Sequence, residues 1–373
     1  MPRSATTRLL ALMIIAAGLA VNAAMLAWIC LKHPALNADF RGFWSYPRFT
    51  PLAQIYTPDA MMHFQQALYP GFRSYFPFTY PPDALLALSW MRGLSYDSAR
   101  TLWTLAGMGA LAAAGAAMFP RRPAAMAALL ASPAVLLTLA LGQTSLFAAA
   151  LLLAGLAALP RRQVLAGVLF GLLTLKPQMG LLLPFLLLGL GAWRAIAAAA
   201  LTAGVLVALS CVLLPPELWH SWAASLPAIQ SDYFAGGTNL ALMVSPEATL
   251  LRLGVGQGLA ATAQLLCAAV LAWAVFRTAR HAPYTRATAL VLAATCLAQP
   301  HAYAYDTVAL PAALALWLDG APGRAAWALA ALLYLAPLAL LTPAAPWFVY
   351  AMPLALLAAA LALPRRGGAH SPP

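Results

Sequence analysis

Acidic residues are so rare in this chain that each can be considered singly. Only nine Asp and Glu occur among 373 residues. Asp39 stands just beyond the apolar run 9–31, in a stretch rich in aromatic residues and arginines. A carboxylate in this position is the strongest candidate for a chemical centre. We therefore expect the rest of the site to be organised around Asn37-Ala38-Asp39-Phe40.

A second charged candidate is Lys176, which lies between two apolar segments. Ionisable groups are costly there and usually functional. Pro177 follows it, and Pro81-Pro82 and Pro300 likewise precede apolar segments. Proline is favoured in the first turn of a helix, and the free N–H groups of a helix N-terminus attract anions. The pattern predicts a phosphate site, although a lysine that only reaches out to the membrane surface would fit the same position.

A third group of polar residues lies in the run His301-Ala302-Tyr303-Ala304-Tyr305-Asp306. A helix starting here would carry Asp306 into the membrane, where a buried carboxylate needs a partner or a proton. His301, Lys176 and Arg73 are the candidate partners. The structural alternative is a histidine that caps the helix and an aspartate without chemistry.

Membrane helices are the elements that must position these residues. The chain is 63% hydrophobic and 8% charged, against roughly 25% charged in soluble domains. Apolar runs of about 20 residues recur from end to end, as in a polytopic all-α transmembrane bundle. We predict one integral membrane domain over 1–373 with about twelve spans. These are 9–31 (an uncleaved first helix), 97–119, 124–141, 145–160, 163–175, 178–190, 195–214, 258–276, 287–299, 303–318, 325–341 and 346–364.

Charge and cysteine content exclude other classes. The formal charge of +12 comes from arginines in short loops, which is typical of positive-inside topology and anionic lipid contact rather than nucleic-acid binding. The four cysteines, Cys30, Cys211, Cys267 and Cys296, have no paired spacing. They predict buried thiols and neither a disulfide framework nor a metal site.

The basic residues also predict the orientation. If the spans alternate, the basic loops share the cytoplasmic side with both termini: Arg121-Arg122, Arg161-Arg162, Arg194, Arg277 to Arg286, Arg324 and Arg365-Arg366. This requires 83–93 to be a half-inserted or surface helix. The loops 32–96 and 215–257 then lie outside, with amphipathic surface helices expected in 51–69 and 216–222. Asp39, Gln143, Lys176 and His301 would all face that outer side, which favours a single site.

The ordered set of motifs resembles glycosyltransferase family 87, enzymes of the GT-C fold that depend on polyprenyl-phosphate-mannose. The resemblance runs from about residue 9 to 310 and rests on Asp39-Phe40, Ile55-Tyr56, Tyr80-Pro81-Pro82, Gly142-Gln143, Lys176-Pro177-Gln178 and a late Pro-His pair. It implies a hexosyltransferase of the bacterial cytoplasmic membrane. Such an enzyme moves a sugar, expected to be mannose, from a lipid-phosphate donor to a lipid or glycan acceptor outside.

The resemblance also implies roles for the residues. Asp39 would be the general base, because a carboxylate can take the acceptor proton during attack on the anomeric carbon. Lys176, His301 and Arg73 would stabilise the leaving polyprenyl phosphate. Tyr80, Gln143 and Gln178 would hold the donor. The sequence has no DxD motif, and no metal or other cofactor is expected.

Two alternatives remain open from the residues. About twelve spans with proline-broken helices also suit a secondary transporter or a lipid flippase. Another GT-C-like enzyme, such as an O-antigen ligase, would share the architecture but use a different substrate. Within the enzyme interpretation, Asp306 is the alternative to Asp39 as the acid or base.

Overall fold

The computed structural model describes residues 38–72, 75–234, 240, 243–319 and 323–339, with parts of 9–24. Every regular element in these residues is a helix, and one isolated bridge pairs Met243 with Tyr303. The predicted all-helical class is confirmed. Arg73, Cys30 and the predicted span 346–364 lie outside the described residues, as does most of 9–31.

The α-helices are α2 (Ala38–Ser45), α3 (Pro58–Leu68), α4 (Asp83–Leu88), α5 (Tyr96–Met118), α6 (Pro123–Leu130), α7 (Pro133–Leu141), α8 (Ser145–Ala158), α9 (Gln163–Gly171), α10 (Leu183–Leu190), α11 (Trp193–Leu213), α12 (Leu218–Phe234), α14 (Pro246–Arg252), α15 (Gln257–His281), α16 (Tyr284–Ala298), α17 (Leu310–Leu318) and α18 (Arg324–Ala339). Short 3₁₀ helices connect them: η1 (Tyr46–Arg48), η2 (Leu52–Gln54), η3 (Ser89–Gly93), η4 (Leu172–Leu175), η5 (Pro177–Gly180) and η6 (Ala304–Ala309).

Four helical segments of the described chain are long and apolar enough to cross a membrane: Tyr96–Met118, Pro123–Leu141, Trp193–Leu213 and Gln257–His281. The second consists of α6 and α7, which break at Ser132 because Ser132 caps α7 and Pro133 opens it. Other predicted spans are apolar helices of 10–17 residues. The helices therefore fall where the sequence predicts them, but the count of about twelve spans stays a prediction.

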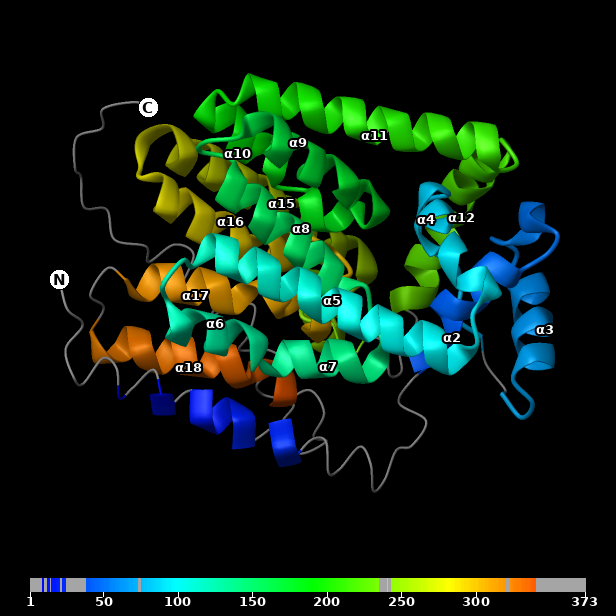
Figure 1. The fold of residues 1–373 in the computed structure, drawn as a ribbon, viewed down its shortest axis with the longest axis horizontal. Coiled ribbons are helices and arrows are strands. Elements are labelled where there is room, and N and C mark those ends of the chain that lie inside the picture. The colour runs from blue at the N-terminus through cyan, green and yellow to red at the C-terminus, as the bar shows by residue number, and fades with distance from the viewer. Residues whose placement is uncertain are drawn as a thin grey trace.

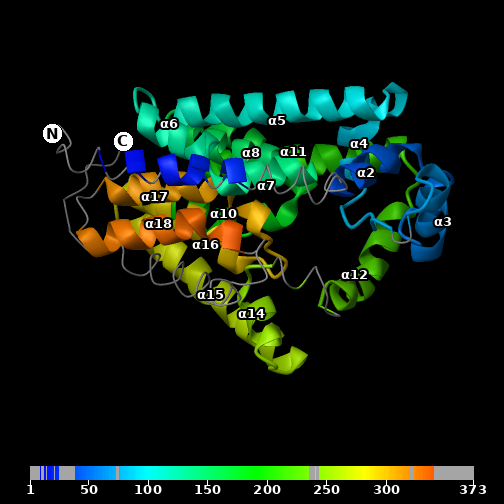
Figure 2. The ribbon, with the colours of Figure 1, turned by 90° about the horizontal axis from the view of Figure 1, so that it is seen from below.

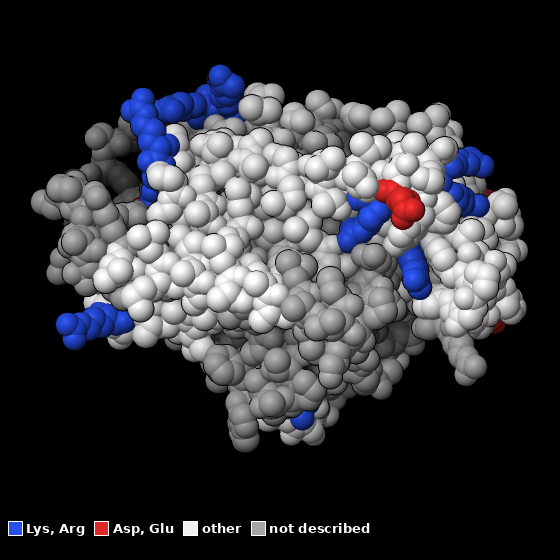
Figure 3. Space-filling model, turned by 60° about the horizontal axis from the view of Figure 1, so that its bottom comes forward, with Lys and Arg blue, Asp and Glu red and all other residues white. Residues whose placement is uncertain are grey.

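The surface of these helices is that of a membrane protein. Large apolar side chains are exposed along α11 and α15, among them Leu201 at 70%, Val212 at 79% and Leu265 at 72%. A soluble protein rarely leaves such a continuous apolar area uncovered. On the face in Figure 3, most basic side chains gather toward the two ends of the molecule, and uncharged residues dominate the area between. This pattern fits a helical bundle immersed in lipid.

The two ends of the bundle differ. The helices α5 and α11 run along the long axis, and α2, α3, α4 and α12 gather at one end, here called the site end (Figures 1 and 2). The turn between α5 and α6 and the start of α11 lie at the other end (Figure 1). Arg121, Arg122 and Arg194 belong to that second end, which we call the basic end.

A separate aromatic core holds the site end together. It is built from buried residues of α2 to α5, including Phe40, Phe43, Phe78 and Trp103. Edge-to-face and stacked ring pairs fill it, such as Phe43 on Trp103 with centroids 5.7 Å apart. The segment 83–93 is the six-residue α4 followed by the five-residue η3. That is too short to cross a bilayer; its placement on the outer face remains a prediction.

Candidate active site

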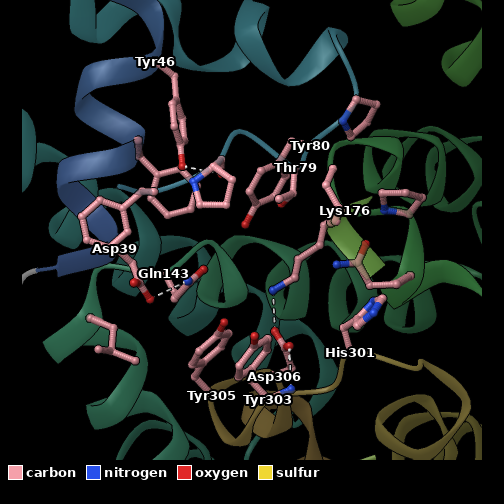
Figure 4. Close-up of a pocket in the computed structure, with 18 of the residues that line it drawn as sticks. Asp39, Tyr46, Thr79, Tyr80, Gln143, Lys176, His301, Tyr303, Tyr305 and Asp306 are labelled. Atoms are coloured by element: carbon pink, nitrogen blue, oxygen red, sulfur yellow. Dashed lines mark hydrogen bonds and ion pairs between the residues drawn. The ribbon is translucent and has the colours of Figure 1, made fainter. Parts of the chain in front are cut away.

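A cavity of about 650 Å³ opens at the site end of the bundle. Its walls come from α2, the 75–81 segment, the turn before α8, the η4–η5 turn, α12 and the 301–306 segment. Figure 4 shows Asp39 on one side and His301 on the other, with Lys176 reaching in between. The structure thus brings together seven of the residues selected from the sequence: Asp39, Tyr80, Gln143, Lys176, Gln178, His301 and Asp306.

Asp39 is positioned by its neighbour Phe40. Phe40 is fully buried and packs against Trp103, with ring centroids 6.0 Å apart. It lies against Gly142, which ends α7 with φ 77°. A Cβ on Gly142 would come within 2.5 Å of the Phe40 Cβ, so only glycine allows this approach. The next residue, Gln143, then reaches Asp39.

The contact between Asp39 and Gln143 is a hydrogen bond of 2.7 Å from Gln143 Nε2 to Asp39 Oδ2. Burial raises the pKa of Asp39, and the Gln143 hydrogen bond and the charge of Lys176 oppose that rise. Among the described residues, no hydrogen bond to Oδ1 is present. A carboxylate held on one oxygen, with a raised pKa and a cavity before it, has the properties of a general base.

Lys176 lies in the turn between η4 and η5 and is only 5% exposed. Its Nζ forms an ion pair with Asp306 Oδ1 and donates a hydrogen bond of 3.0 Å to Ser145 Oγ. Ser145 in turn donates to Asp306 Oδ1 at 2.7 Å. Lys176 is therefore a buried, paired side chain of the cavity wall rather than one extended to the protein surface.

Asp306 is the partner of Lys176 rather than a free acid. Both of its oxygens are engaged, because Oδ2 accepts a hydrogen bond of 3.1 Å from the backbone N–H of Tyr303. The sequence left three partners open, and the structure selects Lys176 over His301; Arg73 lies outside the described residues. Asp306 is thus held by three partners, Lys176, Ser145 and Tyr303, whereas Asp39 is held on one oxygen.

His301 lines the cavity beside the ring of Phe234, with ring centroids 5.1 Å apart. Burial lowers the pKa of His301 to about 4, so its imidazole is neutral near neutral pH. It therefore offers the cavity a hydrogen-bonding group rather than a positive charge. This changes the chemical form in which His301 was expected to act.

Tyr80 and Gln178 occupy different parts of the wall. The Tyr80 hydroxyl lies 3.3 Å from Thr144 Oγ1, and its backbone oxygen accepts a hydrogen bond of 2.8 Å from Tyr56. Gln178 belongs to η5, two residues after Lys176. Both residues line the cavity next to charged groups, where they can hydrogen-bond a polar ligand.

Several residues in the cavity wall or directly behind it were not singled out from the sequence. Ser145 follows Gln143 and Thr144 and completes a polar triplet before an apolar helix, a signal that was readable. Tyr303 and Tyr305 stack with centroids 4.9 Å apart at an angle of 7°. Trp222, expected only at the membrane interface, lines the cavity and donates to Thr79 O at 3.3 Å. No sequence pattern predicts this contact, because Trp222 and Thr79 are 143 positions apart.

A second, apolar groove of about 580 Å³ adjoins the cavity. It lies between α4, α5, α8 and the α9–η4 segment and is lined mainly by alanine, leucine and aromatic side chains. Phe43, Tyr80 and Lys176 line both spaces. The ammonium group of Lys176 thus belongs to a residue at the junction of a polar cavity and an apolar groove.

No group of three His, Cys, Asp or Glu that could hold a metal ion occurs in the residues described here. Among the described residues that line the cavity, Lys176 carries the positive charge, because His301 is neutral.

Fold and site together define a polytopic helical membrane protein with a charged cavity at one end of its bundle. The model of glycosyltransferase family 87 matches residues 78–300, more than half of the chain. The chain belongs to this family and is a membrane glycosyltransferase. The match includes Tyr80, Gln143, Lys176 and Gln178 but stops short of Asp39, His301 and Asp306. Neither the curated proteins nor the solved structures contain a match.

Proposed function

We propose that the protein transfers a hexose, mannose, from a polyprenyl-phosphate-sugar donor to an acceptor hydroxyl at the outer face of a bacterial cytoplasmic membrane. One observation carries the proposal. A carboxylate, Asp39, and an ammonium-bearing residue, Lys176, line one cavity, and Lys176 also lines the adjoining apolar groove. The reaction needs these three features, namely a proton acceptor, a counter-charge for phosphate and a place for a lipid tail.

The junction at Lys176 supports a lipid-phosphate donor. A phosphate near Lys176 Nζ would have its sugar in the polar cavity and its prenyl chain in the groove. A nucleotide donor would instead place a polar base and ribose against the groove, where their hydrogen-bonding groups would lack partners. The charge and polarity of the two spaces therefore favour a donor with one polar and one apolar end.

The chemistry follows from the two charged residues. Asp39 accepts the proton of the acceptor hydroxyl as that oxygen attacks the anomeric carbon. The bond between the anomeric carbon and the phosphate oxygen breaks on the opposite side. The electron pair leaves with the polyprenyl phosphate, whose growing negative charge Lys176 stabilises. Neutral His301 donates a hydrogen bond to the leaving phosphate. The products are the glycosylated acceptor, polyprenyl phosphate and protonated Asp39.

The amide and hydroxyl groups of the wall would bind the sugar. Gln143, Gln178 and Tyr80 line the cavity near the two charged residues and can exchange hydrogen bonds with sugar hydroxyls. The stacked pair Tyr303 and Tyr305 supplies an aromatic wall. The assignment of mannose rests on the family resemblance.

The distribution of arginines supports an outer location for the cavity. Arg121 and Arg122 follow α5, and Arg194 opens α11, at the end opposite the cavity (Figure 1). The helix α8 begins at the cavity, and Arg161 and Arg162 follow its far end. The arginines at the site end belong to the long segment that precedes α5 and to the start of α5, whereas those of the basic end lie in or next to short turns. The positive-inside rule counts short loops, so the basic end faces the cytoplasm.

A donor screen tests the proposal. Protein purified in detergent is given polyprenyl-phosphate mannose, the corresponding glucose donor and nucleotide-linked mannose with a panel of lipid and glycan acceptors. We expect transfer from polyprenyl-phosphate mannose alone. Transfer from the nucleotide sugar would contradict the donor class, whereas transfer from the glucose donor alone would contradict only the sugar.

A further inference from the structure

The turn that opens α8 contacts three separate walls of the cavity. Gln143 Nε2 donates to Asp39 Oδ2 at 2.7 Å. Thr144 Oγ1 lies 3.3 Å from the hydroxyl of Tyr80. Ser145 Oγ donates to Asp306 Oδ1 at 2.7 Å. Three consecutive side chains therefore join α2, the 79–81 turn and η6, and the third of them has no role in the account so far.

Ser145 is the most buried of the three, with no exposed surface. Its hydroxyl has one proton to donate and lone pairs to accept. The proton goes to Asp306, and a lone pair accepts a hydrogen bond of 3.0 Å from Lys176 Nζ. The serine thus touches both members of the buried ion pair, and it begins a helix of 14 residues that cannot easily shift.

This contact determines where the ammonium group points. An ammonium carries three N–H donors in a tetrahedral arrangement. Asp306 takes one and Ser145 takes a second. Asp306 is itself fixed, because Oδ2 accepts from the Tyr303 N–H. Because Asp306 and Ser145 fix two of the N–H directions, the direction of the third is fixed as well. If Asp306 were the single acceptor, the ammonium group could rotate about its hydrogen bond to Asp306.

Figure 4 shows Lys176 reaching Asp306, with Gln143 and Asp39 on the opposite side of the cavity. Lys176 lines both the cavity and the apolar groove. Among the described residues no hydrogen bond uses the remaining N–H, and Nζ lies 5.5 Å from the centroid of the Tyr305 ring, which also lines the cavity. This third N–H is therefore left for an anion in the cavity. A group fixed before the ligand arrives loses little freedom on binding, so a well-aimed lysine binds more tightly than a mobile one.

We propose that Ser145 is a positioning residue for the donor phosphate, one that aims Lys176 at the junction of cavity and groove. The inference rests on the proposed function, in which Lys176 binds that phosphate. Ser145 itself touches Lys176 and Asp306 and acts through them. A serine that only stabilises the packing of α8 would affect all ligands equally, whereas a positioning serine affects those that carry phosphate.

The test compares a phosphate ligand with its alcohol. Binding of undecaprenyl phosphate and of undecaprenol to the purified protein in detergent is measured by tryptophan fluorescence. We expect Ser145→Ala to weaken the binding of undecaprenyl phosphate about tenfold, the order of a lost hydrogen bond to a charged group. The binding of undecaprenol should be unchanged. Ser210→Ala is the matched control, because Ser210 is equally buried and hydrogen-bonded but lies in α11.

Each outcome has a distinct meaning. If Lys176→Ala leaves undecaprenyl phosphate binding intact, the phosphate role of Lys176 in the proposed function is wrong. If Lys176→Ala weakens this binding but Ser145→Ala does not, only the role of Ser145 is wrong. Equal loss for phosphate and alcohol in Ser145→Ala also overturns it. Should Ser145→Ala fail to fold, Ser145→Cys, with a weakly accepting thiol of similar size, gives the same comparison.

Discussion

Gln143 and Asp39 lie 104 positions apart in the chain and are joined by a 2.7 Å hydrogen bond from Nε2 to Oδ2. The bond exists because Gly142 lets α2 pack against the end of α7. It opposes the rise in the pKa of Asp39 that burial causes. One amide therefore both orients the proposed base and limits its tendency to hold a proton at rest.

Replacing this amide should impair the base without removing it. We expect Gln143→Leu to reduce the rate of sugar transfer about 10- to 100-fold, the kinetic equivalent of a hydrogen bond to a charged group. The same change removes an effect that lowers the pKa of Asp39, so the acid side of the pH–rate profile should move to higher pH. Gln163→Leu, at the start of α9 near the basic end, is the control. An unchanged pH–rate profile in Gln143→Leu would contradict the effect of the Gln143 hydrogen bond on the pKa of Asp39.

The pH dependence of the wild-type enzyme should show one ionisation on its acid side. Asp39 must be ionised to accept a proton, and burial raises its pKa, so the rate should fall as the pH drops through this raised value. Stability changes in the opposite direction. A carboxyl whose pKa is raised by folding contributes stability at low pH that is lost as the pH rises through the folded value. The transfer rate and the thermal unfolding temperature, measured on the same samples across pH, check both predictions: the rate should fall, and the contribution of Asp39 to stability should rise, as the pH drops.

His301 should contribute nothing to that profile in the free enzyme. Its pKa is lowered to about 4 by burial, so the ring is neutral across about pH 5 to 8. We expect His301→Gln, which keeps a neutral donor, to retain more transfer activity than His301→Ala and to leave the profile in place. A step near pH 6 that disappears in His301→Gln would show instead that His301 titrates during catalysis.

Filling the apolar groove should affect the lipid part of the donor. Ala110 lies on α5 and lines the groove. We expect Ala110→Trp to raise the KM for a long-chain polyprenyl-phosphate sugar about tenfold, because the added ring takes the volume of the tail. A donor with a very short prenyl chain should be affected less. Ala116→Trp, at an exposed position of the same helix, is the matched control. Equal effects on both donors would argue against the groove as the tail site.

Much of the site could be read from the sequence because polar residues at the starts of apolar helices are visible as local patterns. Gln143, Lys176 and His301 each stand at such a start, Asp39 stands just beyond an apolar run, and all four line one cavity. The alternation of spans placed them on one side without any knowledge of packing. Helix positions were predictable for the same reason, since apolar periodicity is local.

Pairing inside the cavity was not predictable. Whether Asp306 meets Lys176 or His301 depends on how α8, η4 and η6 pack, and Lys176 and Asp306 are 130 positions apart. The groove was hidden because alanine and leucine faces look alike in sequence, whether they touch lipid, protein or an empty space. The short 3₁₀ segments η4, η5 and η6, which shorten the neighbouring helices, likewise follow from tertiary contacts.

The most direct test of the account is sugar transfer by Asp39→Asn, measured in membranes with radiolabelled polyprenyl-phosphate mannose. Asparagine keeps the size and the contact with Gln143 but cannot take up the acceptor proton. We predict a loss of transfer of about 100- to 10,000-fold, typical of a removed general base, with undecaprenyl phosphate still bound. Asp59→Asn, at an exposed position of α3, should transfer normally. Near wild-type transfer by Asp39→Asn would contradict the role of Asp39 as the base.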